Sequence, residues 1–277
     1  MFKRKWMILA LVIGILIIVG IGIKIAKEPT VTSNGKSLPH KTLSEAKQLL
    51  KQAKLYQQQD NLKPAIRLYK QLLSKYSQYT DVIADAQKGL EESTMKLLFS
   101  SAEDSYSTFY IVKPGDTLSK VAKEFDTTVE LLQKSNNLDP SLIYSGQRLK
   151  VVNADLSILV DKTQNLLLLK ANDEVVKTYM VGTGKEGCTP AGVFYIETKL
   201  KDPVWFRAGA VVPPGSPENI LGSRWMGLDV EGIGIHATDD LDSIGKQESK
   251  GCIRMSEKDV KELYSIVPVG TEVKVIE

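Results

Sequence analysis

An unbroken apolar run close to the N-terminus constrains this chain more than any other feature. From Trp6 to Ile23 there are 18 residues without a polar side chain. A helix of that length is about 27 Å long at 1.5 Å per residue, close to the hydrocarbon thickness of a bilayer. Lys3, Arg4 and Lys5 precede the run and favour a cytoplasmic N-terminus. We therefore predict that residues 1–27 are a cytoplasmic stub with one membrane-spanning helix, and that the rest of the chain is extracytoplasmic.

A cleaved signal peptide is the alternative interpretation of this segment. The apolar region of a signal peptide usually has about 7–15 residues and ends at a small-x-small cleavage site. Here the run is longer and is followed by Lys24 and Ile25. Both features favour an uncleaved anchor. Residues 28–39 contain Pro, Gly and Ser and are predicted to be a linker.

The composition limits which chemistries are available. Lys and Arg total 36 against 33 acidic residues, a net charge of +3. The chain therefore lacks the large excess of positive charge that is typical of nucleic-acid-binding proteins, and no nucleic-acid partner is predicted. Two Cys and two His are too few for a disulfide-rich scaffold and argue against a closed four-ligand zinc site. We predict neither a metal nor a cofactor.

Residues 41–100 have the apolar periodicity of helices. One stripe of apolar side chains, spaced by three or four residues, precedes a break at 57–61, where Asp60 is a candidate N-cap. A second stripe follows, and a third helix starts near Val82. The sequence around Ala65 and Tyr69 weakly resembles a tetratricopeptide repeat, but covers little more than one repeat. We predict an α-helical spacer, with a peptide-binding groove as the alternative.

Residues 108–153 are predicted to form a small βααβ module. A short strand at 110–112 stops at a Pro-Gly-Asp turn, after which Thr117 is placed to cap a helix. A second helix is expected over 129–135 and a closing strand over 148–152.

This module closely resembles the lysin-motif (LysM) domain. The resemblance lies in Tyr110-Ile-Val-Lys-Pro-Gly-Asp-Thr-Leu, in Asn136-Asn137, and in Gly146-Gln-Arg-Leu. It implies binding to glycan strands that contain N-acetylglucosamine. The candidate glycan-binding residues are Asp116, Thr117, Leu118, Asn137 and Ile143. For each of them taken singly, the sequence favours a role in the turn or the core.

Residues 155–277 are predicted to be mainly β, as a sandwich or barrel with one helix. Short apolar or β-branched runs are separated by Gly, Pro, Asn and Asp. Only 257–267 has a convincing helical pattern, with Ser256 as its N-cap. Trp205 and Phe206 are assigned to a long loop, in which a lid and simple packing explain them equally well.

One cysteine and one histidine in this domain are candidates for catalysis. Cys252 lies in Ser249-Lys-Gly-Cys-Ile-Arg254, and His236, the only histidine of the domain, is 16 residues upstream. A free thiol is only a few per cent thiolate at neutral pH and needs a base or a neighbouring cation such as Lys250. Gly251 allows a close backbone approach, and the consecutive amides here are candidates for an oxyanion hole. A buried structural Cys and a core His are the alternative.

Three motifs in this domain are similar to the signature of the L,D-transpeptidase family. They are Ile235-His-Ala-Thr, Ser243-Ile-Gly-Lys and Ser249-Lys-Gly-Cys-Ile-Arg-Met. Further matches are Gly182-Thr-Gly, Thr189-Pro-x-Gly-x-Phe and Pro213-Pro-Gly. They follow in order through nearly the whole domain.

The resemblance implies a β-sandwich enzyme at the cell wall that acts on peptidoglycan stem peptides. Its cysteine attacks the amide before the terminal D-Ala of a tetrapeptide stem, and the acyl group passes to an amine of a neighbouring stem. By this resemblance Cys252 is the nucleophile, and a carbapenem is expected to acylate it. His236 is the base, oriented through Nδ1 by a backbone carbonyl. Arg254 is a candidate for gripping a substrate carboxylate, with an ion pair to an acid of the domain as its alternative. The other candidate substrate-binding residues are Gly251, Lys250 and Ser249.

Two alternatives to transpeptidation remain open at this point. The same site would act as an L,D-carboxypeptidase if water intercepts the acyl-enzyme, and a wall-binding protein without catalysis is the second alternative. The sequence also departs from the family pattern, because Lys250 stands where a second histidine is usual and Ala237 where glycine is usual. We expect the ammonium of Lys250 to replace that histidine as a positive neighbour. Cys188 is taken as a loop cysteine, with a disulfide to Cys252 as the alternative.

Overall fold

The computed structural model describes residues 42–138, 142–207 and 209–277. The predicted membrane segment, Trp6–Ile23, lies outside these residues. Within the described ranges, none of the helices combines the length and apolar character needed to cross a bilayer. The chain divides into two compact units, residues 1–96 and 97–277.

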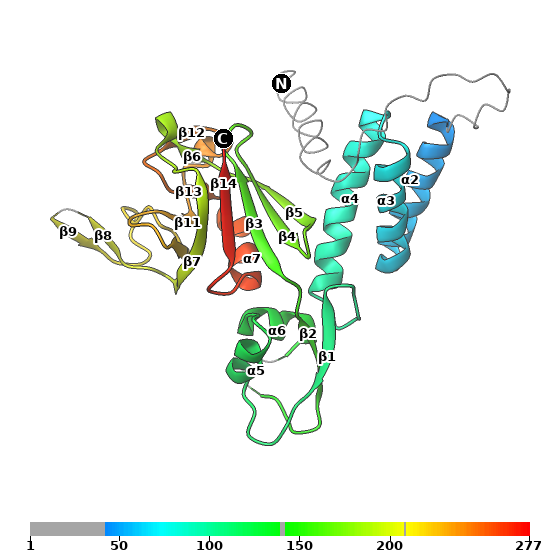
Figure 1. Cartoon of the computed structure of the whole chain (residues 1–277), viewed down its shortest axis with the longest axis horizontal. Helices are drawn as coiled ribbons and strands as arrows, with labels where there is room; N and C mark the ends of the chain where they lie inside the picture. Colours follow the sequence, from blue (N-terminus) through cyan, green and yellow to red (C-terminus); the bar gives the residue numbers. More distant parts are fainter. Residues whose placement is uncertain (1–41, 139–141, 208) are drawn as a thin grey trace. The chain divides into compact units, whose positions relative to one another are not determined.

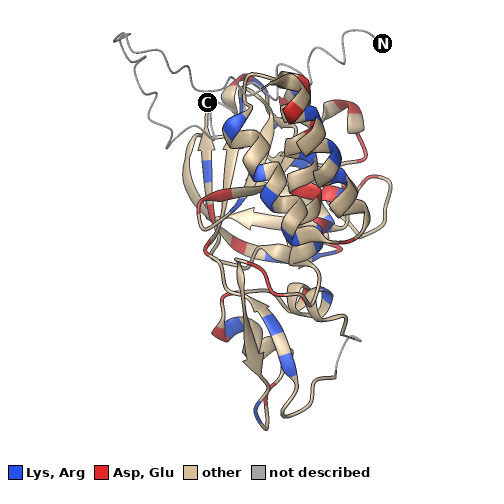
Figure 2. Ribbon diagram, turned by 90° about the vertical axis from the view of Figure 1, so that its right-hand side faces the viewer, with Lys and Arg blue, Asp and Glu red and all other residues tan. Residues whose placement is uncertain are grey.

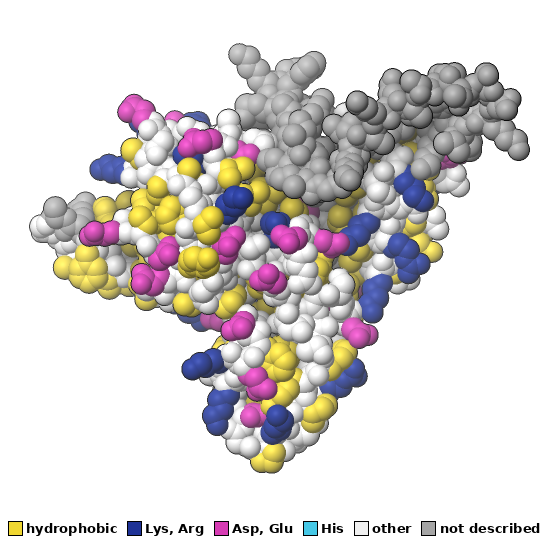
Figure 3. Space-filling view, viewed as in Figure 1, with side chains coloured by type: hydrophobic (Ala, Val, Ile, Leu, Met, Phe, Trp, Pro, Cys, Tyr) yellow, Lys and Arg dark blue, Asp and Glu magenta, His cyan; other side chains and the backbone are white. Residues whose placement is uncertain are grey.

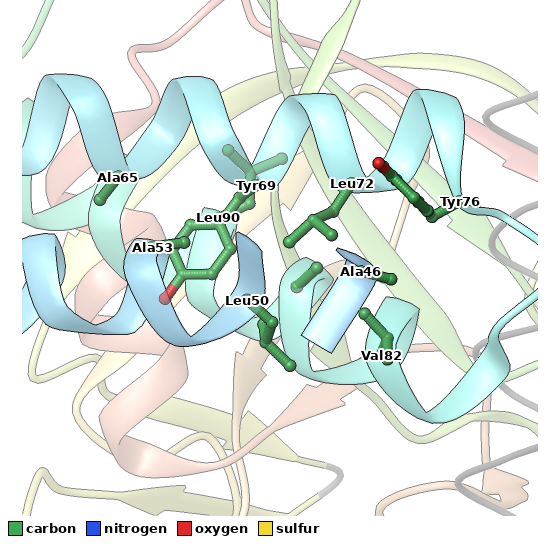
Figure 4. Close-up of a cluster of buried hydrophobic side chains, with 10 residues drawn as sticks. Ala46, Leu50, Ala53, Ala65, Tyr69, Leu72, Tyr76, Val82 and Leu90 are labelled. Carbon is green, nitrogen blue, oxygen red and sulfur yellow. The ribbon is translucent and has the colours of Figure 1, made fainter. Parts of the chain in front are cut away.

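The first unit contains three helices in the segment predicted to be a helical spacer: α2 (Leu43–Gln58), α3 (Leu62–Lys75) and α4 (Thr80–Leu98). Helix α2 begins with a capping box, in which Thr42 and Glu45 exchange hydrogen bonds with each other's backbone N–H. The apolar stripes meet in one cluster around the fully buried Tyr69, as Figure 4 shows. Acidic and basic positions alternate with uncharged ones along these helices (Figure 2).

The predicted N-cap of the second helix is wrong by one residue. Asn61, and not Asp60, precedes α3. The turn after α2 places Asp60 in the left-handed region, with φ 59°, which an N-cap residue does not adopt because its backbone is typically extended. The Asp60 carboxylate instead pairs with the Lys96 ammonium at 2.9 Å.

The second unit begins with the βααβ module. Strands β1 (Ser107–Ile111) and β2 (Arg148–Val152) are antiparallel, and α5 (Leu118–Glu124) and α6 (Val129–Asn136) lie between them in the chain. Thr117 caps α5 as predicted, and Thr128 caps α6. The two helices and the strand pair enclose one apolar core, built from Tyr110, Val112, Leu118, Val121, Ala122, Leu132, Leu149 and Val151.

The rest of this unit is built on one eight-stranded sheet with the order β13-β11-β10-β7-β14-β3-β4-β5. Strand β7 (Gly192–Lys201) joins the two halves, because its first residues pair with β14 (Glu272–Ile276) and its last with β10 (Arg224–Leu228). Figure 1 shows β14 between β7 and β3. The other strands of the sheet are β3 (Leu156–Asp161), β4 (Leu166–Ala171), β5 (Glu174–Met180), β11 (Gly234–Ala237) and β13 (Ile253–Met255).

One α-helix and two short strand pairs complete this mainly-β domain. Helix α7 (Glu257–Ile266) begins at Ser256, as predicted, and contacts β10 and β11. The side strand pairs are β6 (Thr183–Gly184) with β12 (Gln247–Ser249), and β8 (Trp205–Arg207) with β9 (Ala210–Val212). Short 3-10 turns occur at Lys185–Gly187 and Leu241–Ser243.

The loop predicted around Trp205 and Phe206 is a β-hairpin. Strands β8 and β9 turn at Gly209, whose φ of +77° suits glycine. Phe206 pairs with Val211, and these two side chains are 74% and 66% exposed. Apolar side chains gather on this hairpin in Figure 3. The loop prediction failed because each strand has only three residues, too few to show a period.

Candidate active site

The register of three neighbouring strands brings the candidate catalytic residues together. His236 of β11 pairs with Arg254 of β13 on one side and with Trp225 of β10 on the other. Side chains at directly paired positions share one face of a sheet. Cys252 immediately precedes β13, two positions before Arg254. The alternate residues point to the buried face, which contains Met226, Ile235, Ile253 and Met255.

The imidazole of His236 is buried, neutral and oriented. The residue is only 3% exposed, and burial lowers the His236 pKa to about 4. The Arg254 charge also lowers this pKa, whereas hydrogen bonds to the Ala237 and Ile220 backbone act in the opposite direction. Nδ1 lies 2.6 Å from the Ala237 carbonyl oxygen. Because a carbonyl oxygen only accepts, Nδ1 carries the hydrogen and Nε2 keeps its lone pair. The predicted orientation of this ring by a backbone carbonyl is confirmed.

Trp225 covers this imidazole, and the sequence analysis missed it. The indole and imidazole rings are stacked, with centroids 5.8 Å apart and planes inclined by 28°. Gly227 and Gly234 make room for the indole, since a Cβ at Gly234 would lie 2.6 Å from it and one at Gly227 2.8 Å from its Nε1. The sequence signal for this contact is a Trp-x-Gly segment in one strand and a Gly-x-His segment in the next. It can be recognised only when the pairing register of the two strands is known.

The thiol of Cys252 is half-buried between two backbone groups. Sγ donates to the Gly232 carbonyl at 3.3 Å. Burial raises the Cys252 pKa above its ordinary value, while a hydrogen bond from the Gly234 backbone and the charge of Arg254 act in the opposite direction. The thiol form therefore dominates at neutral pH, so nucleophilic attack by Cys252 requires a base.

The loop that carries Cys252 is held by its own hydrogen bonds. The buried Ser249 hydroxyl accepts from the Gly251 N–H at 3.1 Å and donates to the Cys252 carbonyl at 2.7 Å. Gly251 has φ +132°, and a Cβ there would lie 2.7 Å from the Ile233 side chain. Both residues thus shape the loop. Their assignment to substrate binding stays a prediction.

Two basic residues flank the thiol in different ways. The Arg254 guanidinium is partly buried, and its charge acts on both Cys252 and His236. It lies 3.8 Å from the Asp240 carboxylate, which is the ion pair considered as its alternative role. Lys250 is exposed, and its role beside the nucleophile stays a prediction. Cys188 is an exposed loop residue, and both cysteines are free thiols.

In the βααβ module, the candidate glycan-binding residues also have local structural contacts. The Asp116 carboxylate accepts hydrogen bonds from the Tyr110 hydroxyl and the Lys113 N–H. Leu118 is in the core and Ile143 packs against it, while Asn137 is the left-handed C-cap of α6. These contacts explain the fold of the module, and glycan binding by the five residues stays a prediction.

Comparisons with known proteins identify the two parts of the second unit. Residues 155–275 match the L,D-transpeptidase catalytic domain, and residues 110–152 match the LysM domain. The "Putative L,D-transpeptidase YkuD" of Bacillus subtilis is 38% identical over 174 residues, which cover 60% of this chain and 97% of the relative. The "Cell wall-binding protein YocH" of the same species is 48% identical over 56 residues, 20% of each chain.

An L,D-transpeptidase from Mycobacterium smegmatis has 22% sequence identity and a TM-score of 0.38, covering 48% of this chain and 64% of that chain.

The two matched domains define a modular enzyme of the transpeptidase class, with a LysM domain directly before a mainly-β catalytic domain. The protein belongs to the L,D-transpeptidase family. The predicted LysM and L,D-transpeptidase resemblances are both confirmed.

Proposed function

We propose that this protein is a membrane-anchored, cysteine-dependent peptidoglycan L,D-transpeptidase. The observation that carries the proposal is the neutral, oriented imidazole of His236 on the sheet face next to Cys252. A thiol with a raised pKa needs a base, and a histidine with its Nε2 lone pair available supplies one.

In the acylation half-reaction, His236 Nε2 takes the Cys252 proton as Sγ attacks the carbonyl carbon before the terminal D-Ala. A C–S bond forms and the π pair of the carbonyl moves onto oxygen. When this intermediate collapses, the C–N bond breaks, and D-Ala leaves as the amine with the proton from the imidazolium. An amine of a neighbouring stem then attacks the thioester, a new amide forms, and its proton returns to the departing thiolate through His236.

The other domains supply position in this proposal. The LysM domain binds glycan strands that contain N-acetylglucosamine, through the region of Asp116, Thr117, Leu118, Asn137 and Ile143. The name of the relative YocH, a cell wall-binding protein, supports a wall location. The membrane anchor is proposed from the apolar run Trp6–Ile23 and places the enzyme domain outside the membrane.

The test compares the two cysteines of the chain. Purified wild type, Cys252→Ala and Cys188→Ala are incubated with disaccharide tetrapeptides, and cross-linked dimers and released D-Ala are measured by mass spectrometry. We expect no dimer from Cys252→Ala and wild-type yield from Cys188→Ala. Dimer formation by Cys252→Ala near the wild-type rate would overturn the proposal. Release of D-Ala without dimers would support the carboxypeptidase alternative.

A further inference from the structure

Thr189 lies between two backbone segments of the catalytic domain, and the mechanism above does not use it. The residue is fully buried. Its hydroxyl accepts a hydrogen bond from the Gly184 N–H at 2.7 Å and donates one to the Gly251 carbonyl at 2.7 Å. The Thr189 carbonyl in turn accepts from the buried Lys162 ammonium at 3.0 Å. One hydroxyl thus ties β6 to the peptide unit directly before the nucleophile.

The two segments are packed too closely to move independently of this hydroxyl. A Cβ at Gly184 would lie 2.4 Å from the Thr189 nitrogen and 2.8 Å from its hydroxyl oxygen. A Cβ at Gly251 would lie 3.1 Å from the Cys188 carbonyl oxygen. Glycine at both positions allows the backbones to approach each other, and the Thr189 hydroxyl bridges them.

The geometry of the peptide bond carries this constraint to Cys252. The Gly251 carbonyl and the Cys252 N–H belong to one trans peptide unit, in which the two groups point in opposite directions. Fixing the carbonyl on Thr189 therefore directs the Cys252 N–H away from Thr189. The peptide units on either side are fixed as well, because the Ser249 hydroxyl accepts a hydrogen bond from the Gly251 N–H and donates one to the Cys252 carbonyl.

We infer that Thr189 is a positioning residue: its hydroxyl orients the Cys252 amide to donate to the oxyanion that forms when Sγ attacks the substrate carbonyl. The inference rests on the proposed function of Cys252. A backbone donor of this kind acts without reorganisation at the moment of reaction, and removal of one oxyanion donor typically costs about 10²- to 10³-fold in rate. Since Ser249 still holds part of the loop, we expect a loss of about 10- to 100-fold when the Thr189 hydroxyl is removed.

The test separates acylation of Cys252 from its alkylation. A carbapenem acylates sulfur at a carbonyl carbon and creates an oxyanion, whereas iodoacetamide alkylates the thiolate at a saturated carbon and creates none. Thr189→Val in the full chain should slow carbapenem acylation about 10- to 100-fold. Its rate of iodoacetamide alkylation against pH should equal that of the wild type. Thr189→Ser keeps the hydroxyl and should restore acylation.

Thr271→Val is the matched control, because the Thr271 hydroxyl is also buried and donates to a backbone carbonyl, that of Pro268 at 2.8 Å. We expect wild-type acylation from it. If valine at 189 prevents folding, Thr189→Ala removes the same hydroxyl and should show the same selective loss.

Wild-type acylation in Thr189→Val would overturn the inference. An equal fall in acylation and alkylation would overturn it too, because a purely structural role of Thr189 affects both reactions. A failure of the proposed function gives a different result: the wild type itself would then acquire no carbapenem adduct on Cys252.

Discussion

Hydrogen bonds from polar side chains hold both the first turn of the LysM domain and the loop at Cys252, but they span very different distances along the chain. In the turn, Asp116 accepts from Tyr110 and Lys113, and Thr117 caps the helix through Lys120, all within six residues. At the catalytic loop, the Thr189 hydroxyl reaches Gly251, 62 residues away. The turn is therefore a local structure, whereas the geometry at the nucleophile also depends on a contact with a distant part of the chain.

The two regions also differ in electrostatics. The hydrogen bonds of Lys113 and Lys120 in the LysM turn are exposed to water. His236 is buried, and its pKa is lowered to about 4. A substitution near His236 therefore acts through burial and orientation, and we expect larger effects there than in the LysM turn.

Removal of the imidazole should have the largest effect on the catalytic region. His236→Ala should reduce dimer formation about 10²- to 10⁴-fold, since a positioned general base contributes that much. The measurement is the steady-state rate with disaccharide tetrapeptides. His40→Ala changes the chain's other histidine and should keep the wild-type rate. If His236→Ala kept more than a tenth of the wild-type rate, His236 would not be the general base.

The buried imidazole should also make stability depend on pH. The folded His236 pKa is about 4, below the ordinary 6.5, so between these values the unfolded chain binds a proton that the folded chain does not. Stability from this group is fully present above pH 6.5 and falls as the pH drops towards 4, by about 3 kcal/mol in total. The measurement is the free energy of unfolding in denaturant, for wild type and His236→Gln, at pH 7 and pH 4.5. The difference between the two proteins gives the contribution of His236. Equal pH slopes for the two proteins would contradict it.

The indole over His236 allows a finer test of burial. Trp225→Ala exposes one face of the imidazole, so the His236 pKa should rise towards 6.5 and the acid limb of the acylation rate should move to higher pH. With a pKa as high as 6.5, about a quarter of the imidazole would be neutral at pH 6, so we expect a rate loss of up to about fourfold there. Trp225→Phe keeps a ring over the imidazole and should behave like the wild type. An unshifted acid limb in Trp225→Ala would show that the indole does not control this pKa.

The smallest effect should come from the local turn of the LysM domain. Thr117→Ala removes the N-cap of α5 and should lower the free energy of unfolding by about 1 kcal/mol. Turnover of a soluble stem peptide should not change. A matched substitution, Thr108→Ala, changes a threonine in β1 that caps no helix. A loss of turnover in Thr117→Ala would mean that the turn is coupled to the active site and is not a purely local structure.

The same distinction between local and long-range contacts explains what the sequence alone could predict. The caps Thr117 and Ser256 and the helices that follow them were predictable, because cap and partner are three residues apart. His236 and Cys252 were found through family motifs. The roles of Trp225 and Thr189 were not predicted, although Thr189 lies in one of the family motifs, because their contacts with His236 and Gly251 form only when distant parts of the chain come together.

The central claim is that Cys252 forms the acyl-enzyme with the stem peptide. Its most direct test is to mix the protein with a disaccharide tetrapeptide, quench in acid within the first turnover, and map the digested protein by mass spectrometry. We expect the peptide that contains Cys252 to gain the mass of the disaccharide tetrapeptide minus that of D-Ala, and the peptide that contains Cys188 to stay unmodified. Release of D-Ala with the acyl group on Cys188, or on no residue at all, would contradict the account.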